Sequence, residues 1–277
     1  MNLLKFLFVL FFLLLVGLIY SENQSYQMAV TKSGVNAIVL LNGYPFFEIG
    51  DKDTSMANNI NYLIIKGMNT ITIHVEKISD DAKFPSFSLR LYVYPDGAKS
   101  TSEFKEVYKF EWDSFKSENK DADTGNPIYP KDQKYEFTID TPPPSNFFNE
   151  GQKITLNDDT KEKAFNLIKE FYNSIAKNDM DKFFKLQEYK INDVYSSMYM
   201  TDIKSKMESS KKYLTDLIKK PEFKLEPVKK EDLIYKLYCN DKLLWIKTKD
   251  KKAPIQTSSF EIEMIFGLIN NELKLVR

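Results

Sequence analysis

Cysteine and histidine, which carry much of enzyme chemistry, are scarce in this sequence. Its 277 residues contain one cysteine, Cys239, and one histidine, His74. One thiol cannot form an internal disulfide or a C-x-x-C redox pair, and a zinc site built from His and Cys needs more than two such ligands. His74 alternates with Ile73 and Val75, so we place it on the polar face of a strand. We therefore predict no catalytic residues, no metal site and no cofactor.

Aromatic residues offer a different chemistry, because a group of exposed aromatic side chains can bind a partner. The chain has 16 tyrosines and 21 phenylalanines. The stretch 189–200 contains several of these tyrosines but has no regular helical or strand period. We predict partner or ligand binding by a set of five residues from this stretch and from two later strands: Tyr195, Met198, Tyr199, Tyr235 and Trp245. The alternative is that these side chains only fill strands and cores.

An apolar stretch begins the chain. Lys5 precedes fourteen apolar residues at 6–19, and polar residues begin at Ser21. This is the layout of a secretory signal peptide, while residues 3–20 are also near the shortest length that spans a bilayer as a helix. We predict that residues 1–21 are a cleaved signal peptide or an uncleaved membrane anchor. The rest of the chain is then periplasmic, extracellular or held at the membrane.

Charge is divided unevenly along the chain, although the formal net charge is zero. Residues 21–156 contain 14 Lys and Arg against 19 Asp and Glu, and residues 157–277 contain 24 against 20. The difference favours two folding units. It is much smaller than the basic excess of a nucleic-acid-binding domain, so we predict no nucleic-acid partner.

The first unit, at 22–140, has the pattern of an all-β sandwich. Apolar residues alternate with polar ones at 70–75 and 86–94, and further strands are expected at 104–112 and 135–139. Many short strands between turns indicate two packed sheets. A polar loop is expected at 113–133.

Two phrases of this unit resemble the jelly-roll accessory domains that are similar to sugar-binding modules of glycoside hydrolases. They are Leu41-Asn-Gly43 and the segment Asn61-Tyr-Leu-Ile-Ile-Lys-Gly-Met-Asn-Thr-Ile71. The resemblance implies that Gly67 lies in a tight turn and that Asn69 bonds to the turn backbone. It also raises the alternative that the unit binds carbohydrate.

The second unit, at 157–277, follows a proline-rich linker at 141–156. Helices are expected at 160–177, after Asn178-Asp179 and from Thr201 to Lys219, because apolar residues recur there at helical spacing between cap residues. Strands then follow, with one face made of Phe223, Leu225, Leu233, Tyr235, Leu237, Cys239, Phe260, Ile262, Met264 and Phe266.

Helices followed by a curved antiparallel sheet resemble the nuclear-transport-factor-2-like, or cystatin-like, cone superfold. The residues that carry the resemblance are 167–176, Asn178-Asp-Met-Asp181 and the closing hairpin at 269–275. Enzymes of this superfold place an Asp, His or Tyr inside the cone. Apart from Cys239, which we expect to be a small core residue, only Tyr235 among the inward positions is not purely apolar, which argues against acid–base catalysis.

We therefore predict an all-β sandwich followed by an α+β cone domain, with an N-terminal apolar export helix. The predicted function is that of a non-enzymatic binding or interaction protein of the cell envelope, with a protein partner there and contact with the membrane through 3–20 if that segment is retained. Two alternatives remain open. The cone could bind a small molecule or act as an enzyme, and the sandwich could bind carbohydrate.

Overall fold

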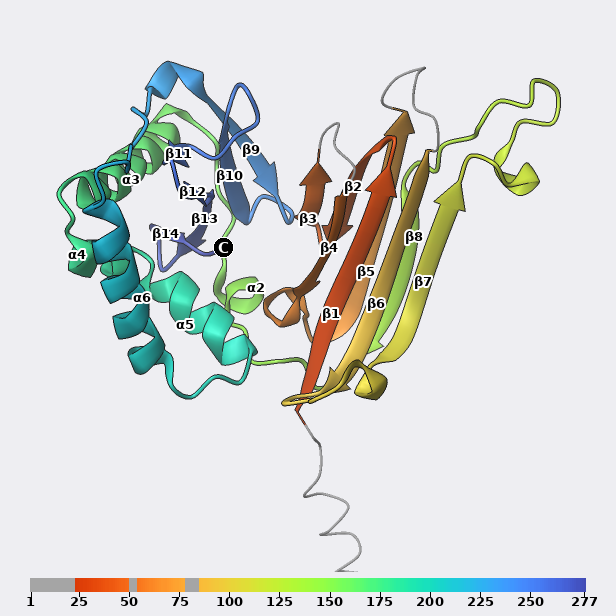
Figure 1. The fold of residues 1–277 in the computed structure, drawn as a ribbon, viewed down its shortest axis with the longest axis horizontal. Coiled ribbons are helices and arrows are strands. Elements are labelled where there is room, and N and C mark those ends of the chain that lie inside the picture. The colour runs from red at the N-terminus through yellow and green to blue at the C-terminus, as the bar shows by residue number, and fades with distance from the viewer. Residues whose placement is uncertain (1–22, 50–53, 78–84) are drawn as a thin grey trace, which may run out of the picture.

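The computed structural model describes residues 23–49, 54–77 and 85–277, so the predicted signal peptide or anchor lies outside the described residues. The fold is a sheet-rich α+β arrangement in which the strands pair in antiparallel sheets (Figure 1). Among the helices in the described ranges, none combines the length and apolar character that a membrane span requires.

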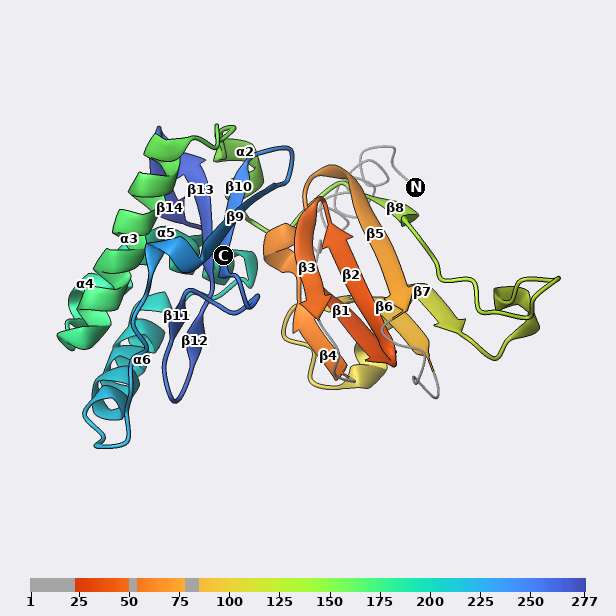
Figure 2. The ribbon, with the colours of Figure 1, turned by 90° about the horizontal axis from the view of Figure 1, so that it is seen from above.

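Two four-stranded sheets face each other in the N-terminal part, in the manner of a β-sandwich (Figures 1 and 2). Their strand orders are β4-β1-β6-β7 and β3-β2-β5-β8. The elements are β1 (Gln24–Ser33), β2 (Val35–Leu41), β3 (Tyr44–Ile49), β4 (Thr54–Asn59), η1 (Asn61–Leu63), β5 (Gly67–Lys77), β6 (Ser86–Pro95), η2 (Thr101–Glu103), β7 (Lys105–Asp113), η3 (Ser117–Asn119) and β8 (Gln133–Ile139).

Alternation of side chains explains how these sheets pack. Along β1, Tyr26, Met28 and Val30 are buried between the sheets, and the residues between them are more exposed. Successive side chains of a strand point to opposite faces, so each strand supplies one apolar row to the core. The strands predicted at 70–75, 86–94, 104–112 and 135–139 correspond to β5, β6, β7 and β8.

Hydrogen bonds from the side chains of Asn42 and Asn69 stabilise the connections between strands of these sheets. Asn42 and Gly43 have φ of 53° and 77°, as the tight turn between β2 and β3 requires. Gly67 has φ of 86°, and the Asn69 carboxamide bonds both the N–H and the carbonyl of Ile65, at 2.9 and 2.8 Å. Asn42 donates to Asn69 at 2.8 Å. The backbone bonding predicted for Asn69 is confirmed, whereas Gly67 keeps a positive φ as the first residue of β5, paired with Ile139, and is not inside a turn.

Helices and a third four-stranded sheet, of order β14-β13-β10-β9, form the C-terminal part. Figures 1 and 2 show α3, α4 and α6 on the side of this sheet that faces away from the N-terminal sheets. The elements are α2 (Phe147–Glu150), α3 (Asp158–Ala176), α4 (Met180–Leu186), α5 (Glu188–Ser197), α6 (Ile203–Ile218), η4 (Lys230–Asp232), β9 (Leu233–Tyr238), β10 (Leu243–Thr248), β11 (Ile255–Gln256), β12 (Glu261–Ile262), β13 (Met264–Ile269) and β14 (Glu272–Leu275).

Side-chain caps begin two of the predicted helices. The Asn157 side chain accepts a hydrogen bond from the N–H of Thr160 at 2.9 Å and begins α3. Asp179 accepts from the N–H of Lys182 at 3.0 Å and begins α4. Such caps satisfy donors that the first helical turn leaves unpaired. The third predicted helix corresponds to α6, whereas α5 was not predicted.

The inner face of the C-terminal sheet packs on α3 and α4, as predicted. Phe171 of α3 and Phe266 of β13 are 1% and 0% exposed. The nine predicted inward positions other than Cys239 all lie in this core or pack against it: Phe223, Leu225, Leu233, Tyr235, Leu237, Phe260, Ile262, Met264 and Phe266.

Three features of this sheet differ from the sequence prediction. Leu225 forms only an isolated bridge with Thr257, so the strand expected around it is absent from the described structure. The strand expected from 260 to 266 is divided at Glu263. Cys239 was predicted on the inner face, but β9 ends one residue earlier. Its φ of 54° places it in a turn, where strand alternation no longer applies, and its side chain joins the core of the N-terminal part.

The segment 141–156, predicted as a proline-rich linker, packs against both parts of the molecule. Phe147 of α2 is fully buried in a core that contains residues of the N-terminal sheets and of the C-terminal sheet. Lys242 donates to the carbonyl of Phe148 at 3.0 Å, and Gln152 forms a bridge with Leu268.

A buried ion pair within the C-terminal part also contacts the N-terminal part. Arg277 Nη1 lies 2.7 Å from Asp193 Oδ2, and the two side chains are 1% and 2% exposed. Asp193 also accepts hydrogen bonds from the N–H of Asn146 at 2.5 Å and the hydroxyl of Ser145 at 3.1 Å. Arg277 Nη2 donates to the carbonyl of Tyr62, in the N-terminal part, at 2.7 Å. We call these five residues the Arg277 clamp.

Candidate functional site

The face of the C-terminal sheet that points away from the helices carries the candidate site. In the β9–β10 pair, Trp245 is opposite Lys236 and Lys247 is opposite Ile234. Leu244 and the other alternate residues of β10 face the helices. Much of this outer face packs on the N-terminal sheets, through Leu243, Trp245, Ile265 and Ile269, and an open part remains beside β9 and the end of β10.

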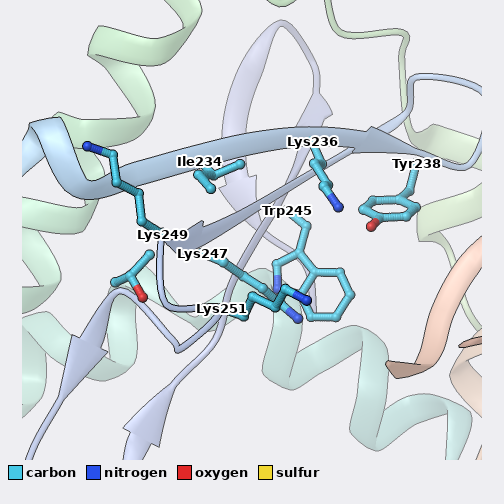
Figure 3. A pocket seen from close by; sticks show the side chains of 8 residues that line it. Ile234, Lys236, Tyr238, Trp245, Lys247, Lys249 and Lys251 are labelled. Carbon is cyan, nitrogen blue, oxygen red and sulfur yellow. The ribbon is translucent and has the colours of Figure 1, made fainter. Parts of the chain in front are cut away.

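The open part contains a hollow of about 110 Å³, which we call the lysine–tryptophan hollow. It is lined by Ile234, Lys236, Tyr238, Trp245, Lys247, Thr248, Lys249 and Lys251. Figure 3 shows Lys247 and Lys251 beside the indole ring, and Lys249 extending away from it. Among these described lining residues there are four lysines and no carboxylate.

Trp245 is held in one orientation. Its Nε1 donates to Glu263 Oε2 at 2.8 Å, and the ring of Tyr238 lies 5.8 Å from its own. The Nζ of Lys247 lies 3.9 Å from the indole centroid, within the range of a cation–π contact. Only 8% of Trp245 is exposed. The tryptophan therefore acts as a fixed wall that positions a lysine, and does not offer a free flat ring.

This arrangement is suited to binding an anion. Several ammonium groups around a small concavity create a positive potential that attracts negatively charged groups. Lysine supplies point charges that adapt to carboxylate, phosphate or sulfate, whereas arginine would impose bidentate geometry. The apolar surface of Trp245 and Ile234 lowers the local exposure to water, which strengthens such contacts.

Tyr235 of β9 and Trp245 of β10 lie on opposite faces of the sheet, so the structure does not bring these two predicted residues together. The side chain of Tyr235 packs against the helix–sheet core, and its hydroxyl is buried without a hydrogen-bond partner among the described residues. Burial, followed by the charge of Glu162, raises the pKa of this hydroxyl.

Tyr195, Met198 and Tyr199 lie at the end of α5, where the chain meets the N-terminal sheets. The hydroxyl of Tyr199 donates to the carbonyl of Gln24 at 3.2 Å. Beside it, the carbonyl of Ser197 accepts from Asn61 at 2.8 Å. All three predicted residues are half-buried. This stretch therefore contacts the N-terminal part of the same chain and does not line the hollow.

Cys239 and His74 occupy places with little potential for catalysis. Burial raises the pKa of the Cys239 thiol to about 12, and a thiol in that state is a poor nucleophile. The ring nitrogens of His74 lie 2.9 Å from Glu76 and 3.4 Å from Asp132, on the outside of the sheet. Across the residues described here, no three His, Cys, Asp or Glu side chains gather as a metal site would require.

A second concavity, of about 920 Å³, runs between the edge strand β14 and helices α3, α4 and α5. Phe171 and Phe266 form part of its floor, while Glu170 pairs with Lys182 at its rim, 3.1 Å apart. The rim therefore carries both acidic and basic side chains. We refer to it as the β14 groove.

Sequence reasoning missed the lysines of the hollow and the Arg277 clamp. A signal for the lysines was present, because Trp245, Lys247, Lys249 and Lys251 occur at every second position. For the clamp there was none, since Asp193 and Arg277 are 84 residues apart and look like ordinary surface residues.

Comparison with known proteins adds no relative. No protein-family model, no curated protein and no solved structure matches this chain.

Proposed function

We propose that this protein is a non-enzymatic binding protein of the cell envelope, which binds an anionic partner at the lysine–tryptophan hollow. The observation that carries the proposal is the set of four lysines that line the hollow, together with the fixed side chain of Trp245. The apolar segment at 1–21, predicted to be a signal peptide or membrane anchor, supports a place in the envelope.

The finer architecture that we propose is a β-sandwich followed by a cone domain like that of nuclear transport factor 2. The position of α3 over an antiparallel sheet supports this assignment. In enzymes of that superfold the chemistry lies inside the cone. Here the inner face is occupied by buried apolar side chains such as Phe171 and Phe266, which favours a binding role over catalysis.

The anion site can be tested with labelled poly-L-glutamate and the full-length chain in neutral detergent, by fluorescence anisotropy. We expect binding that weakens with added salt and falls roughly tenfold in a Lys247→Glu, Lys251→Glu double variant. The matched control changes Lys219 and Lys220, exposed beyond the end of α6, to glutamate. Equal loss in both variants, or no binding of poly-L-glutamate, would refute the proposed site.

The export step needs a separate measurement. Residues 1–30 can be fused to a reporter enzyme that is active only outside the cytoplasm. Activity of that fusion supports an envelope protein, and an inactive fusion that is expressed in full contradicts it.

The β14 groove favours a second candidate function, binding of a small amphipathic molecule. Its floor includes Leu186 and Leu273, and its rim is charged. A Leu273→Trp variant should fill part of the groove. A compound that raises the unfolding temperature of the natural chain but not of this variant would support the second candidate, whereas a compound that stabilises both equally would not.

A further inference from the structure

Strand β9 forms an open edge beside the hollow. It is the last strand in the order β14-β13-β10-β9, and its only strand partner in the described structure is β10. Edge strands present backbone donors and acceptors that can pair with another chain.

The groups that β9 leaves open can be identified from its register. Lys249 donates to the carbonyl of Asp232 at 2.8 Å, directly in line with the β9–β10 pairs. Hydrogen-bonded pairs alternate along an antiparallel ladder, so Ile234 and Lys236 turn their N–H and C=O toward β10. Tyr235 and Leu237 then turn theirs outward, and no backbone partner for them occurs within the described part of the chain.

The side chains along this edge differ on its two faces. Ile234 and Lys236 lie on the face of the hollow, where Ile234 is 39% exposed. Tyr235 and Leu237 lie on the other face and are half-buried against the helix–sheet core. A strand added here would meet positive charge on one face and apolar surface on the other.

We propose that the anionic partner is a protein with an extended acidic segment, which adds antiparallel to β9 as a fifth strand of this sheet. This inference rests on the proposed function and names the partner of the same site. Backbone bonds to Tyr235 and Leu237 provide the attachment, and alternating acidic side chains reach Lys236 and the hollow. The remaining side chains of the segment are apolar and continue the layer of Tyr235 and Leu237.

The geometry fixes which backbone groups of the partner take part. In an antiparallel pair, two residues that exchange hydrogen bonds carry their side chains on the same face. The partner's apolar residues, opposite Tyr235 and Leu237, therefore turn their N–H groups toward β9. Its acidic residues turn theirs to solvent.

The test uses a synthetic peptide of about seven residues, a usual strand length, in which glutamate and valine alternate. One version carries N-methyl groups on the valine amides, and a matched control carries them on the glutamate amides. Binding of each to the full chain in neutral detergent is measured by anisotropy. We expect the valine-methylated peptide to bind roughly tenfold more weakly than the parent and the control to bind about as well as the parent. Lys236→Glu should weaken the parent peptide to a similar degree.

Other results overturn the inference. Equal binding of the valine-methylated and parent peptides would show that no strand is added. The inference is also overturned if the parent peptide does not bind under conditions in which poly-L-glutamate binds. In both cases the proposed anion site itself would stand. Loss of poly-L-glutamate binding as well would remove the proposed function. Circular dichroism of the Lys236→Glu variant is the control that checks whether its fold is intact.

Discussion

The Arg277 clamp should be one of the most sensitive points in the molecule. Asp193→Asn keeps the shape of the side chain and removes its charge, while Arg277 remains charged and 1% exposed. The arginine would retain the carbonyls of Val276 and Tyr62, at 2.6 and 2.7 Å, and the rings of Tyr62 and Phe147 about 5 Å away. None of these partners carries a compensating charge.

The expected cost follows from the burial of the pair. Removing one partner of a buried ion pair typically lowers the free energy of unfolding by about 3–5 kcal/mol, because the remaining charge is not solvated. That is a large part of the roughly 5–15 kcal/mol that stabilises most proteins. When Arg277→Met is added to Asp193→Asn, the unpaired charge disappears. The double variant should therefore lose less than the sum of the two single losses, with a coupling of about 1–3 kcal/mol.

Urea unfolding of the full chain, followed by circular dichroism and tryptophan fluorescence, measures these losses. The matched control is Glu170→Gln, which removes an exposed ion pair to Lys182 at 3.1 Å and should leave the unfolding midpoint almost unchanged. The reasoning is refuted if Asp193→Asn loses under about 1 kcal/mol, or if the two clamp variants are strictly additive.

Three further predictions concern buried groups. Phe171→Ala and Phe266→Ala should each lower the free energy of unfolding by about 3–5 kcal/mol, and losses under about 1 kcal/mol in urea titrations would show that these rings are not packed in a filled core. Desolvation, followed by the charge of Arg277, lowers the pKa of Lys190 from 10.5 to about 8. Because the unfolded chain holds this proton more tightly, the stability of the natural chain relative to Lys190→Met should rise between those two pH values, and a constant difference would contradict the assignment. Near neutral pH, Cys239 should react with a thiol reagent roughly a hundredfold more slowly in the folded chain than in urea, and comparable rates would show that its thiol is not buried.

Local pattern accounts for much of the fold. Strands β5 and β6 have alternating polar and apolar residues, and α3 has a cap at Asn157 and an apolar face that ends at Ile175, so short-range sequence indicates the type of each element. Helix α5 escaped prediction because its buried residues are Asp193 and Ser197. Their burial depends on distant partners, among them Arg277, and no local period reports such contacts.

The candidate site shows the same division between local and distant information. Alternation placed Trp245 and Tyr235 on strands correctly, yet they lie on opposite faces of the sheet and only Trp245 borders the hollow. The hollow is formed by the pairing of Lys236 with Trp245 across two strands, together with the packing of Leu243 on the N-terminal sheets, which covers part of the same face. Both depend on the assembled sheet. The open edge of β9 is likewise a property of strand order, because nothing in residues 233–238 distinguishes an edge strand from a central one. A surface of this kind depends on strand pairing and strand order, so it can be argued only from the assembled sheet.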